Sequence, residues 1–351
     1  MQSIEQFREQ VLSASASGRA LRIRGGGTKD WYGQRIEGDI LDTRTHSGIV
    51  DYEPTELVIT ARCGTPLAEI EAVLAERNQM LAFEPPYFGA GATFGGAVAC
   101  GLSGPRRASS GALRDFMLGA KLMDGKGQEL TFGGQVMKNV AGYDVSRLLA
   151  GSLGTLGLLL EMSVKVLPRA VREATLRFEA SEIEALRMLN EWGGQPLPVS
   201  ASCWSDGVLF IRLSGAEAAV DAAVRSLGGE GVADADTFWK SLREQQHAFF
   251  ADAECLWRLS VPTAAGAIIL KGEQLIEWGG AQRWLKAGSD AETAQKIRRT
   301  AAAVGGHATL FRGGDKGVGV FHPLAPAVAK IHERLKTAFD PSHIFNPGRM
   351  Y

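Results

Sequence analysis

Glycine is concentrated between residues 91 and 168, where it separates short apolar segments. Within it, most positions of residues 93–104 carry a small side chain. Glycine adopts positive φ angles without strain and lets another group approach the backbone closely. Such a stretch predicts a chain that either turns tightly or lies against a flat ligand, and the glycines alone leave both interpretations open.

A second glycine motif lies closer to the N-terminus. Residues 20–24 predict a short strand that ends in Gly25-Gly26-Gly27, followed by the turn-forming residues Thr28-Lys29-Asp30. Consecutive amides without side chains form a concave anion site that suits a pyrophosphate, and Arg24 and Lys29 would add positive charge. The alternative is a plain glycine turn.

The hydrophobic pattern predicts further elements up to residue 170. Thr65 and Pro66 are expected to start a helix, as N-cap and first-turn residue respectively, and Asp124-Gly125 indicates a hairpin over residues 115–132. The other predicted elements are strands at 39–43, 57–61 and 155–167 and a short helix at 145–149.

The second half of the chain alternates predicted strands with helices. Ser181 and Glu184 form a capping box at the start of one of these helices. The predicted strands are 173–179, 208–213, 255–261, 267–270, 307–312 and 318–321, and the predicted helices are those from Ser181, at 216–227, around Trp239 and at 291–304. Successive strand–helix–strand units predict a ferredoxin-like antiparallel α+β domain. A last helix, 326–339, would carry one apolar face (Val328, Ile331, Leu335 and Phe339) and lead into a docked tail.

Composition excludes several functional classes. A net charge of -1 does not indicate the excess of positive charge that is typical of nucleic-acid-binding proteins. No apolar run reaches the roughly 18 residues that span a bilayer. The N-terminus lacks a signal-peptide pattern, so a cytoplasmic protein is expected. Cys63, Cys100, Cys203 and Cys255 are scattered singly, which argues against zinc, an iron–sulfur cluster or a disulfide framework. A P-loop and a nicotinamide-binding glycine motif are also missing.

Seven segments, in this order, resemble the flavoproteins of the vanillyl-alcohol oxidase / p-cresol methylhydroxylase (PCMH) type. They are Arg24-Gly25-Gly26-Gly27-Thr28-Lys29, Thr93-Phe94-Gly95-Gly96, Arg114-Asp115, Asp124-Gly125, Lys138-Asn139-Val140-Ala141-Gly142-Tyr143-Asp144, Gly151-Ser152-Leu153-Gly154-Thr155-Leu156-Gly157, and the tail Asp340-Pro341 with Phe345-Asn346-Pro347-Gly348-Arg349. Within this family the chain resembles the smaller flavin-binding subunits of bacterial glycolate oxidases, in its length, in residues 138–144 and 256–262, and in the tail.

The resemblance implies an α+β fold with three parts. A PCMH-type FAD-binding lobe would occupy residues 1–170, in subdomains of about 1–50 and 51–170, a cap 171–325, and a returning helix and tail 326–351. Thr28 stands where relatives with covalent flavin carry histidine, so FAD is expected to bind non-covalently. The implied cofactor-binding residues are Arg24, Gly25, Gly26, Gly27, Thr28, Lys29, Thr93, Gly95, Gly96, Gly101, Gly104, Gly111, Gly151, Ser152, Gly154, Gly157 and Asn346.

The catalytic residues are less well defined. Relatives that oxidise D-2-hydroxy acids carry a histidine-rich metal cluster in the cap, whereas residues 306–315 lack its spacing, so His307 and His322 are expected to be structural and no metal is expected. A guanidinium would be needed to hold a small 2-hydroxy acid by its carboxylate, and Arg258 and Arg312 are the candidates. Lys138 and Tyr143 would face the flavin or brace their strand.

Three functions follow from the resemblance. The first is an FAD-binding subunit that helps a complex oxidise glycolate to glyoxylate, with a catalytic flavin subunit and an iron–sulfur subunit as partners. The second is a stand-alone FAD-dependent 2-hydroxy-acid or alcohol oxidase, and the third is a flavin-free scaffold. Any association with the inner membrane would come through partners, without direct insertion.

Overall fold

The computed structural model describes residues 4–35, 37–134 and 144–350, which fall into two compact units. Unit 1 comprises residues 1–103, 111–168 and 323–351, and unit 2 comprises residues 104–110 and 169–322. Both combine helices with antiparallel sheets, which confirms the predicted α+β class. No helix in these described ranges is long and apolar enough to cross a membrane.

Unit 1 is built on a five-stranded antiparallel sheet with the strand order β3-β4-β8-β6-β7. Two smaller sheets, the parallel pair β1-β2 and the antiparallel pair β5-β9, complete it. The strands are β1 (Leu21–Arg24), β2 (Asp39–Asp42), β3 (Ile49–Glu53), β4 (Val58–Arg62), β5 (Gln79–Met80), β6 (Met117–Met123), β7 (Glu129–Gly133), β8 (Leu158–Lys165) and β9 (Leu167–Pro168). The β6–β7 hairpin confirms the prediction from Asp124-Gly125: the Asp124 carboxylate accepts hydrogen bonds from the amides of Lys126 and Gln128.

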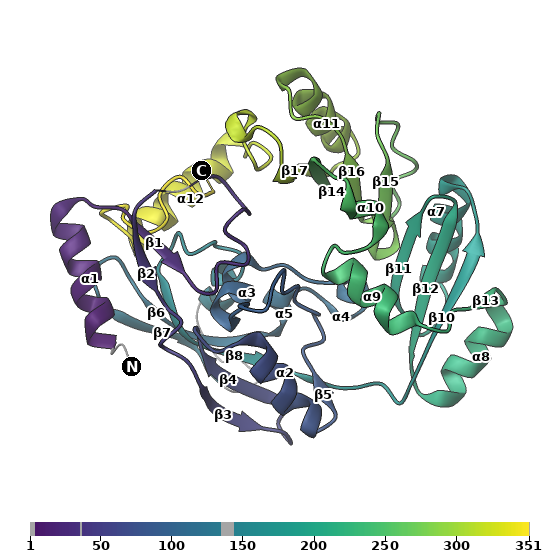
Figure 1. Ribbon diagram of the computed structural model, residues 1–351, viewed down its shortest axis with the longest axis horizontal. Helices are drawn as coiled ribbons and strands as arrows, with labels where there is room; N and C mark the ends of the chain where they lie inside the picture. The colour runs from purple at the N-terminus through teal and green to yellow at the C-terminus, as the bar shows by residue number, and fades with distance from the viewer. Residues whose placement is uncertain (1–3, 36, 135–143, 351) are drawn as a thin grey trace. The chain divides into compact units, whose positions relative to one another are not determined.

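Strand β8 supplies apolar side chains to two separate cores. Leu159, Met162 and Val164 join the core beneath α2 and α3, whereas Leu158 and Leu160 pack with α1, β1 and the C-terminal tail. Figure 1 shows α1 lying beside β1 and β2. The helices of unit 1 are α1 (Ile4–Ser17), α2 (Leu67–Glu76), α3 (Phe94–Cys100), α5 (Leu113–Phe116), α6 (Val145–Leu149) and α12 (Pro326–Phe339).

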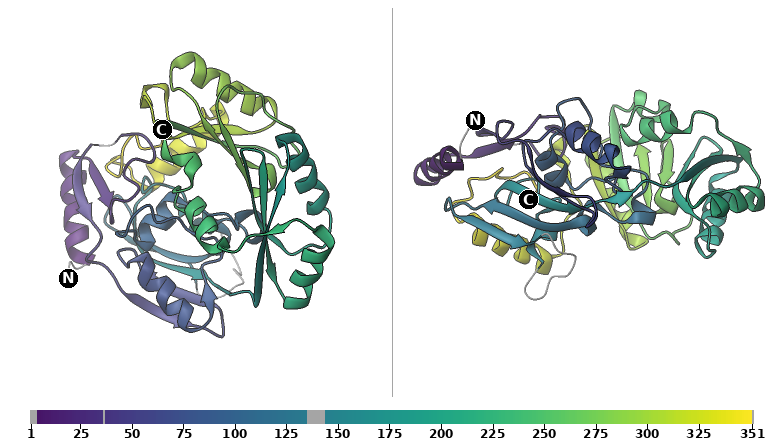
Figure 2. Two further views of the ribbon diagram at one scale, coloured as in Figure 1. Left: turned by 45° about the vertical axis from the view of Figure 1, so that its right-hand side comes forward. Right: turned by 90° about the horizontal axis from the view of Figure 1, so that it is seen from below.

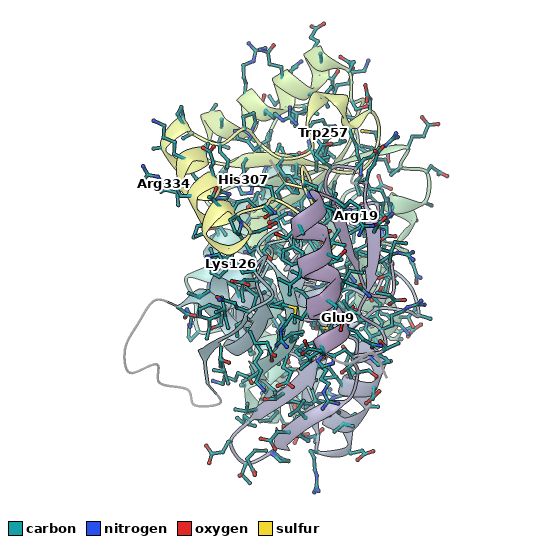
Figure 3. The ribbon with its side chains drawn as sticks, turned by 90° about the vertical axis from the view of Figure 1, so that its left-hand side faces the viewer. Glu9, Arg19, Lys126, Trp257, His307 and Arg334 are labelled. Atoms are coloured by element: carbon teal, nitrogen blue, oxygen red, sulfur yellow. The ribbon has the colours of Figure 1, made fainter. Side chains whose placement is uncertain are left out.

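The final helix, α12, packs only its C-terminal half against the core of unit 1. Leu335 and Phe339 contact this core, and the rings of Phe132 and Phe339 meet edge to face at 6.1 Å. Figure 2 (right) shows α12, in yellow, alongside the strands of unit 1. Val328 and Ile331 are 41% and 56% exposed, so the first half of the predicted apolar face is not buried by the described residues. Charged side chains such as Glu9 of α1 and Arg334 of α12 point outward (Figure 3).

Unit 2 contains one eight-stranded antiparallel sheet with the order β13-β10-β12-β11-β15-β16-β14-β17. Its first half runs β10–α7–β11–β12–α8–β13, and its strands lie in the spatial order four-one-three-two, as in the expected ferredoxin-like arrangement. Helices α7 and α8 pack against this half and share its core. These elements are β10 (Arg172–Glu179), α7 (Glu182–Gly193), β11 (Val199–Ser205), β12 (Val208–Gly215), α8 (Glu217–Leu227) and β13 (Glu230–Gly231).

The second half of unit 2 extends the same sheet, with α11 packed against it around the buried Trp257. Its strands are β14 (Cys255–Ser260), β15 (Gln274–Glu277), β16 (Gln282–Lys286) and β17 (His307–Gly313). Its helices are α9 (Ala235–Arg243), α10 (Ala248–Ala251) and α11 (Ala291–Ala303), with short 3₁₀ segments η1 (Trp278–Gly280) and η2 (Lys316–Val318), and α4 (Arg107–Ser110) is contributed from earlier in the chain.

Some local predictions are wrong. Residues 267–270 form a loop and 318–321 end a 3₁₀ turn, whereas the sheet uses β11, β15 and β16, which the sequence did not indicate. Strand β3 was also not predicted. Thr65 does not cap α2, because its hydroxyl donates to the Arg62 carbonyl and accepts from the Gly48 amide.

One buried and two half-buried histidines predict a loss of stability in mild acid. Burial lowers the pKa of His46, His247 and His322 below the usual 6.5. Below pH 6.5 these histidines take up protons in the unfolded chain but stay neutral in the folded chain. The free energy of unfolding should therefore fall as the pH falls from about 6.5 toward the lowered pKa values. Urea unfolding at pH 7.5 and 5.5 measures this slope, which His46→Phe should reduce; equal midpoints for the wild type would contradict the prediction.

Candidate functional site

The predicted anion loop lies directly after β1 in unit 1. Parallel pairing with β2 holds Arg24 in register with Asp42, and the amide of Thr43 donates to the Arg24 carbonyl at 3.0 Å. The chain then turns at Gly27, whose φ is +73° and whose carbonyl accepts from the Asp30 amide at 3.1 Å. A left-handed φ of this kind favours glycine, which accounts for this position of the motif.

Close backbone packing accounts for the glycine before it. A Cβ atom on Gly26 would lie 1.5 Å from the carbonyl oxygen of Gly91, where neither backbone can give way without moving its loop. On Gly25 the added atom would lie 2.4 Å from the hydroxyl of Thr93. The two glycine motifs recognised in the sequence therefore lie directly against each other.

The loop presents unpaired amides to a cavity. Among the described residues, no acceptor pairs with the amide nitrogens of Gly26, Gly27 or Thr28, and these three residues line the cavity wall. A row of such N–H groups is a concave binding surface for anions. The arrangement supports the anion-site interpretation over a turn stabilised by its own hydrogen bonds.

Cationic side chains surround this loop. Arg22 and Arg24 both bind the Asp30 carboxylate, at 2.6 and 2.7 Å. Lys29 is buried and its ammonium donates to the Tyr87 carbonyl at 3.1 Å. Arg349 also lines the cavity, so four cations against one carboxylate give the site an excess of positive charge.

Helix α3 forms the opposite wall. Thr93 is its N-cap and accepts a hydrogen bond from the Gly96 amide at 3.2 Å, while Gly101 ends the helix with a left-handed φ of +62°. Gly96, Ala99 and Cys100 line the cavity, and burial raises the pKa of the Cys100 thiol. The small residues of this stretch therefore form a short helix with one face toward the loop.

The C-terminal tail closes the third side through Asn346. Its side-chain oxygen accepts from the Ile23 amide at 2.9 Å, and its side-chain nitrogen donates to the Leu153 carbonyl at 2.7 Å. Both polar ends are thus engaged by backbone groups of unit 1. Asn346 lines the cavity as a brace between β1 and the loop at residues 151–155.

The cavity encloses about 80 Å³, below the roughly 300–1,000 Å³ that surrounds a whole drug-sized ligand. Its size therefore suits the phosphate portion of a dinucleotide. The residues that line it are Arg22, Ile23, Arg24, Gly25, Gly26, Gly27, Thr28, Lys29, Asp30, Thr93, Gly96, Ala99, Cys100, Leu153, Asn346 and Arg349.

Several of the implied cofactor residues do not line this cavity. Gly95 packs against Cys63, and Gly104 lies in unit 2, where its carbonyl accepts from the Trp278 indole at 3.1 Å. The others shape neighbouring loops: Gly101, Gly151, Ser152 and Gly154 adjoin α3 or Asn346, Gly111 lies against Asp115, and Gly157 packs on Met123 and Leu122. Their contact with a cofactor stays a prediction.

The catalytic candidates lie on neighbouring strands of unit 2. Arg258 on β14 has its guanidinium 5.2 Å from the centre of the Phe311 ring, and Arg312 on β17 donates to the Phe250 carbonyl at 3.4 Å. Neither residue lines the cavity described above. Lys138 and Tyr143 lie outside the described residues.

The histidines of unit 2 do not gather with carboxylates or thiols. His322 accepts a hydrogen bond from the Ala308 amide at 3.4 Å, a structural contact. Across the described ranges, no group of three or more His, Cys, Asp or Glu side chains has the geometry to hold a metal ion.

The diphosphate of FAD fits the cavity of unit 1. Unpaired amides and an excess of cations are the features that such a group requires. Sequence reasoning did not assign Arg22 or Arg349 to the site. Alternation along β1 would have placed Arg22 on the same side as Arg24, and Arg349 was recognised only as the end of the family tail.

Several known proteins are similar to this chain. Residues 1–133 match the family model described as "FAD binding domain". The glycolate oxidase subunit GlcE of Escherichia coli (strain K12) is 53% identical over 343 residues, covering 98% of this chain and 96% of that protein. The D-lactate dehydrogenase of Archaeoglobus fulgidus is 25% identical, covering 93% and 85%.

A shorter match and a solved structure agree with this. The glycolate oxidase subunit GlcD of Bacillus subtilis (strain 168) is 30% identical over 149 residues, covering 42% of this chain and 31% of that protein. A structure of alkyldihydroxyacetonephosphate synthase superposes with a TM-score of 0.67, covering 99% of this chain and 76% of that one. At 15% identity, this last likeness shows a common fold alone.

Proposed function

The chain belongs to the FAD-binding family that includes the glycolate oxidase subunit GlcE, and we propose from this premise that it is the FAD-binding subunit of a complex that oxidises glycolate to glyoxylate. The observation that carries the proposal is 53% identity along almost the whole of both chains. The chain is accordingly an FAD-dependent oxidoreductase that acts on a CH–OH donor as part of a complex.

Unit 1 serves as the FAD-binding lobe and unit 2 as the cap. When bound, the flavin supplies a hydride acceptor. The chain contributes the Gly26–Thr28 amides and the nearby cations, which are placed to hold a diphosphate. Arg258 or Arg312 would hold the carboxylate of a small 2-hydroxy acid, and Lys138 stays the third candidate; the domain boundaries near residues 170 and 325 also stay predictions.

The proposed partners follow from the path of the electrons. The sequence carries neither a nicotinamide motif nor the cysteine spacing of an iron–sulfur cluster, so a reduced flavin must pass its electrons to another subunit. We assign that role to a catalytic flavin subunit of the GlcD type together with an iron–sulfur subunit. A cytoplasmic location, with any contact to the inner membrane made by those partners, completes the proposal.

One observation favours a second function. The similarity to a D-lactate dehydrogenase extends along 93% of this chain and 85% of that protein. A similarity over nearly the whole of both chains favours a stand-alone hydroxy-acid oxidoreductase as the second candidate. Against it, residues 306–315 lack the histidine spacing of the metal cluster in such relatives.

The first test is the cofactor and its attachment. We expect the purified chain to show flavin absorption near ~450 nm, a property of the cofactor itself. Because Thr28 has no imidazole with which to bond the flavin, acid precipitation should release all of the colour into the supernatant. Absence of flavin bands would favour a scaffold role, and colour retained in the pellet would contradict non-covalent binding.

Anaerobic mixing with glycolate separates the two catalytic functions. For the complex, we expect the flavin of the isolated subunit to stay oxidised and that of the co-purified complex to bleach. Bleaching of the isolated chain would establish a stand-alone oxidase instead. D-Lactate, run in parallel, tests the narrower substrate assignment.

A further inference from the structure

Arg349 is a buried cation on the cavity wall. It belongs to the C-terminal tail and is only 7% exposed, yet it lines the same cavity as the Gly25–Lys29 loop. The family tail that the sequence indicated ends with this residue, and the proposed function gives it no role.

The guanidinium of Arg349 is only partly used by the protein. Its Nη2 donates to the carbonyls of Lys29 and Asp30, at 3.1 and 3.2 Å. Within the described ranges no acceptor pairs with Nη1 or Nε, and no carboxylate lies within 4 Å of the group. Donors therefore remain for a group that enters the cavity.

The nearest carboxylate is already engaged. Asp30 binds Arg22 and Arg24 at 2.6 and 2.7 Å, and it forms no ion pair with Arg349 in the described structure. Burial lowers the pKa of Arg349, because removing the guanidinium from water disfavours its charged form and the neighbouring groups do not fully offset this cost. A buried charge of this kind is costly unless it is paired, and an anionic ligand would pair it.

We propose that Arg349 is a binding residue for the diphosphate of the cofactor, which makes the C-terminal tail part of the cofactor site. This inference rests on the proposed function. The guanidinium would bind phosphate oxygens together with the Gly26–Thr28 amides, while its Nη2 holds the loop to the tail.

Tail docking and ligand binding are then coupled. The tail is fixed by the amide of Leu21 donating to Ile344, by the amide of Gln34 donating to Arg349, and by the Asn346 side chain. A ligand that neutralises Arg349 removes the cost of burying its charge, so it should stabilise the docked tail.

Binding of inorganic pyrophosphate tests the inference without flavin. Thermal shift and calorimetry would compare wild-type apoprotein with Arg349→Gln and Arg349→Lys, using FAD and riboflavin as further probes. Arg334→Gln is the control, because Arg334 is exposed on α12 in the same C-terminal segment (Figure 3). We expect Arg349→Gln to weaken pyrophosphate and FAD about tenfold or more, Arg349→Lys to have a smaller effect, and Arg334→Gln to match the wild type.

The outcomes separate the inference from the function on which it rests. Pyrophosphate and FAD binding that is unchanged in a folded Arg349→Gln variant would overturn the role of Arg349, and so would a wild type that pyrophosphate does not stabilise. Binding of pyrophosphate that depends on Arg349, in a chain that takes up no FAD, would support the anion site and refute the flavoprotein. Riboflavin, which lacks the diphosphate, should bind all variants alike; dependence of its binding on Arg349 would count against the proposal.

Discussion

Replacing Gly26 with alanine should empty the cofactor site of a chain that still folds. The added Cβ would lie 1.5 Å from the carbonyl oxygen of Gly91, so one of the two loops must move. Overpacking of this kind costs about 1–3 kcal/mol of stability. The larger effect should be on FAD binding, because the amides of a displaced loop no longer converge on one anion. We expect the FAD content of the purified protein to fall about tenfold or more, since each 1.4 kcal/mol of binding free energy is a factor of ten in affinity.

Gly193→Ala is the matched control for this substitution. An atom added there meets nothing within 4 Å, and Gly193 is exposed at the C-terminal end of α7 in unit 2. We expect this variant to keep wild-type flavin content and circular dichroism. Full FAD occupancy in Gly26→Ala would show that the loop does not hold the cofactor.

Elements with a complete local signal were predictable. Helix α7 follows the capping box, in which Ser181 accepts from the Glu184 amide and Glu184 accepts from the Ser181 amide, and it begins at Glu182. The same holds for the β6–β7 hairpin at Asp124. In both cases the residues that determine the local structure are close together in the sequence, so the sequence pattern alone was enough to predict the element.

The two false strands have a common physical cause. Residues 267–270 are apolar, but their loop is held by Arg283, whose guanidinium is fully buried and donates to the carbonyls of Ala265 and Gly266. Near residue 318, Arg298 likewise donates to the carbonyls of Val318 and Gly319. In each case an arginine from another part of the chain binds backbone carbonyls that a neighbouring strand would otherwise bind. The local pattern of apolar residues does not reveal that arginine.

The candidate site also has a part that the sequence could predict and a part that it could not. The loop Gly25–Lys29 and the stretch from Thr93 to Gly96 could be found because positive φ angles and close backbone contact require glycine. Arg349 could not, because its place depends on the tail crossing the molecule to reach a loop some 320 residues earlier. Contacts between distant segments are fixed by the fold as a whole.

Lys336 anchors the root of that tail, and its loss should be the most destabilising change in unit 1. Its ammonium donates to Asp340 at 2.6 Å and to the carbonyls of Thr155 and Phe345 at 2.7 Å each, entirely within the core. Lys336→Met would leave the fully buried Asp340 carboxylate without its cation. We expect the free energy of unfolding, measured with urea, to fall by about 3–5 kcal/mol.

A double-mutant cycle identifies the cause of that loss. If the unpaired charge is responsible, Lys336→Met combined with Asp340→Asn should be more stable than the sum of the two single changes predicts, because the double variant buries no isolated ion. Lys330→Met, on the exposed side of the same helix, should stay within about 0.5 kcal/mol of the wild type. Strict additivity would assign the loss to packing instead. Because the amides of Ile344 and Phe345 also donate to Asp340, the unpaired carboxylate lies where the tail turns back toward β1, and Lys336→Met should lower FAD affinity even though it touches no part of the cavity.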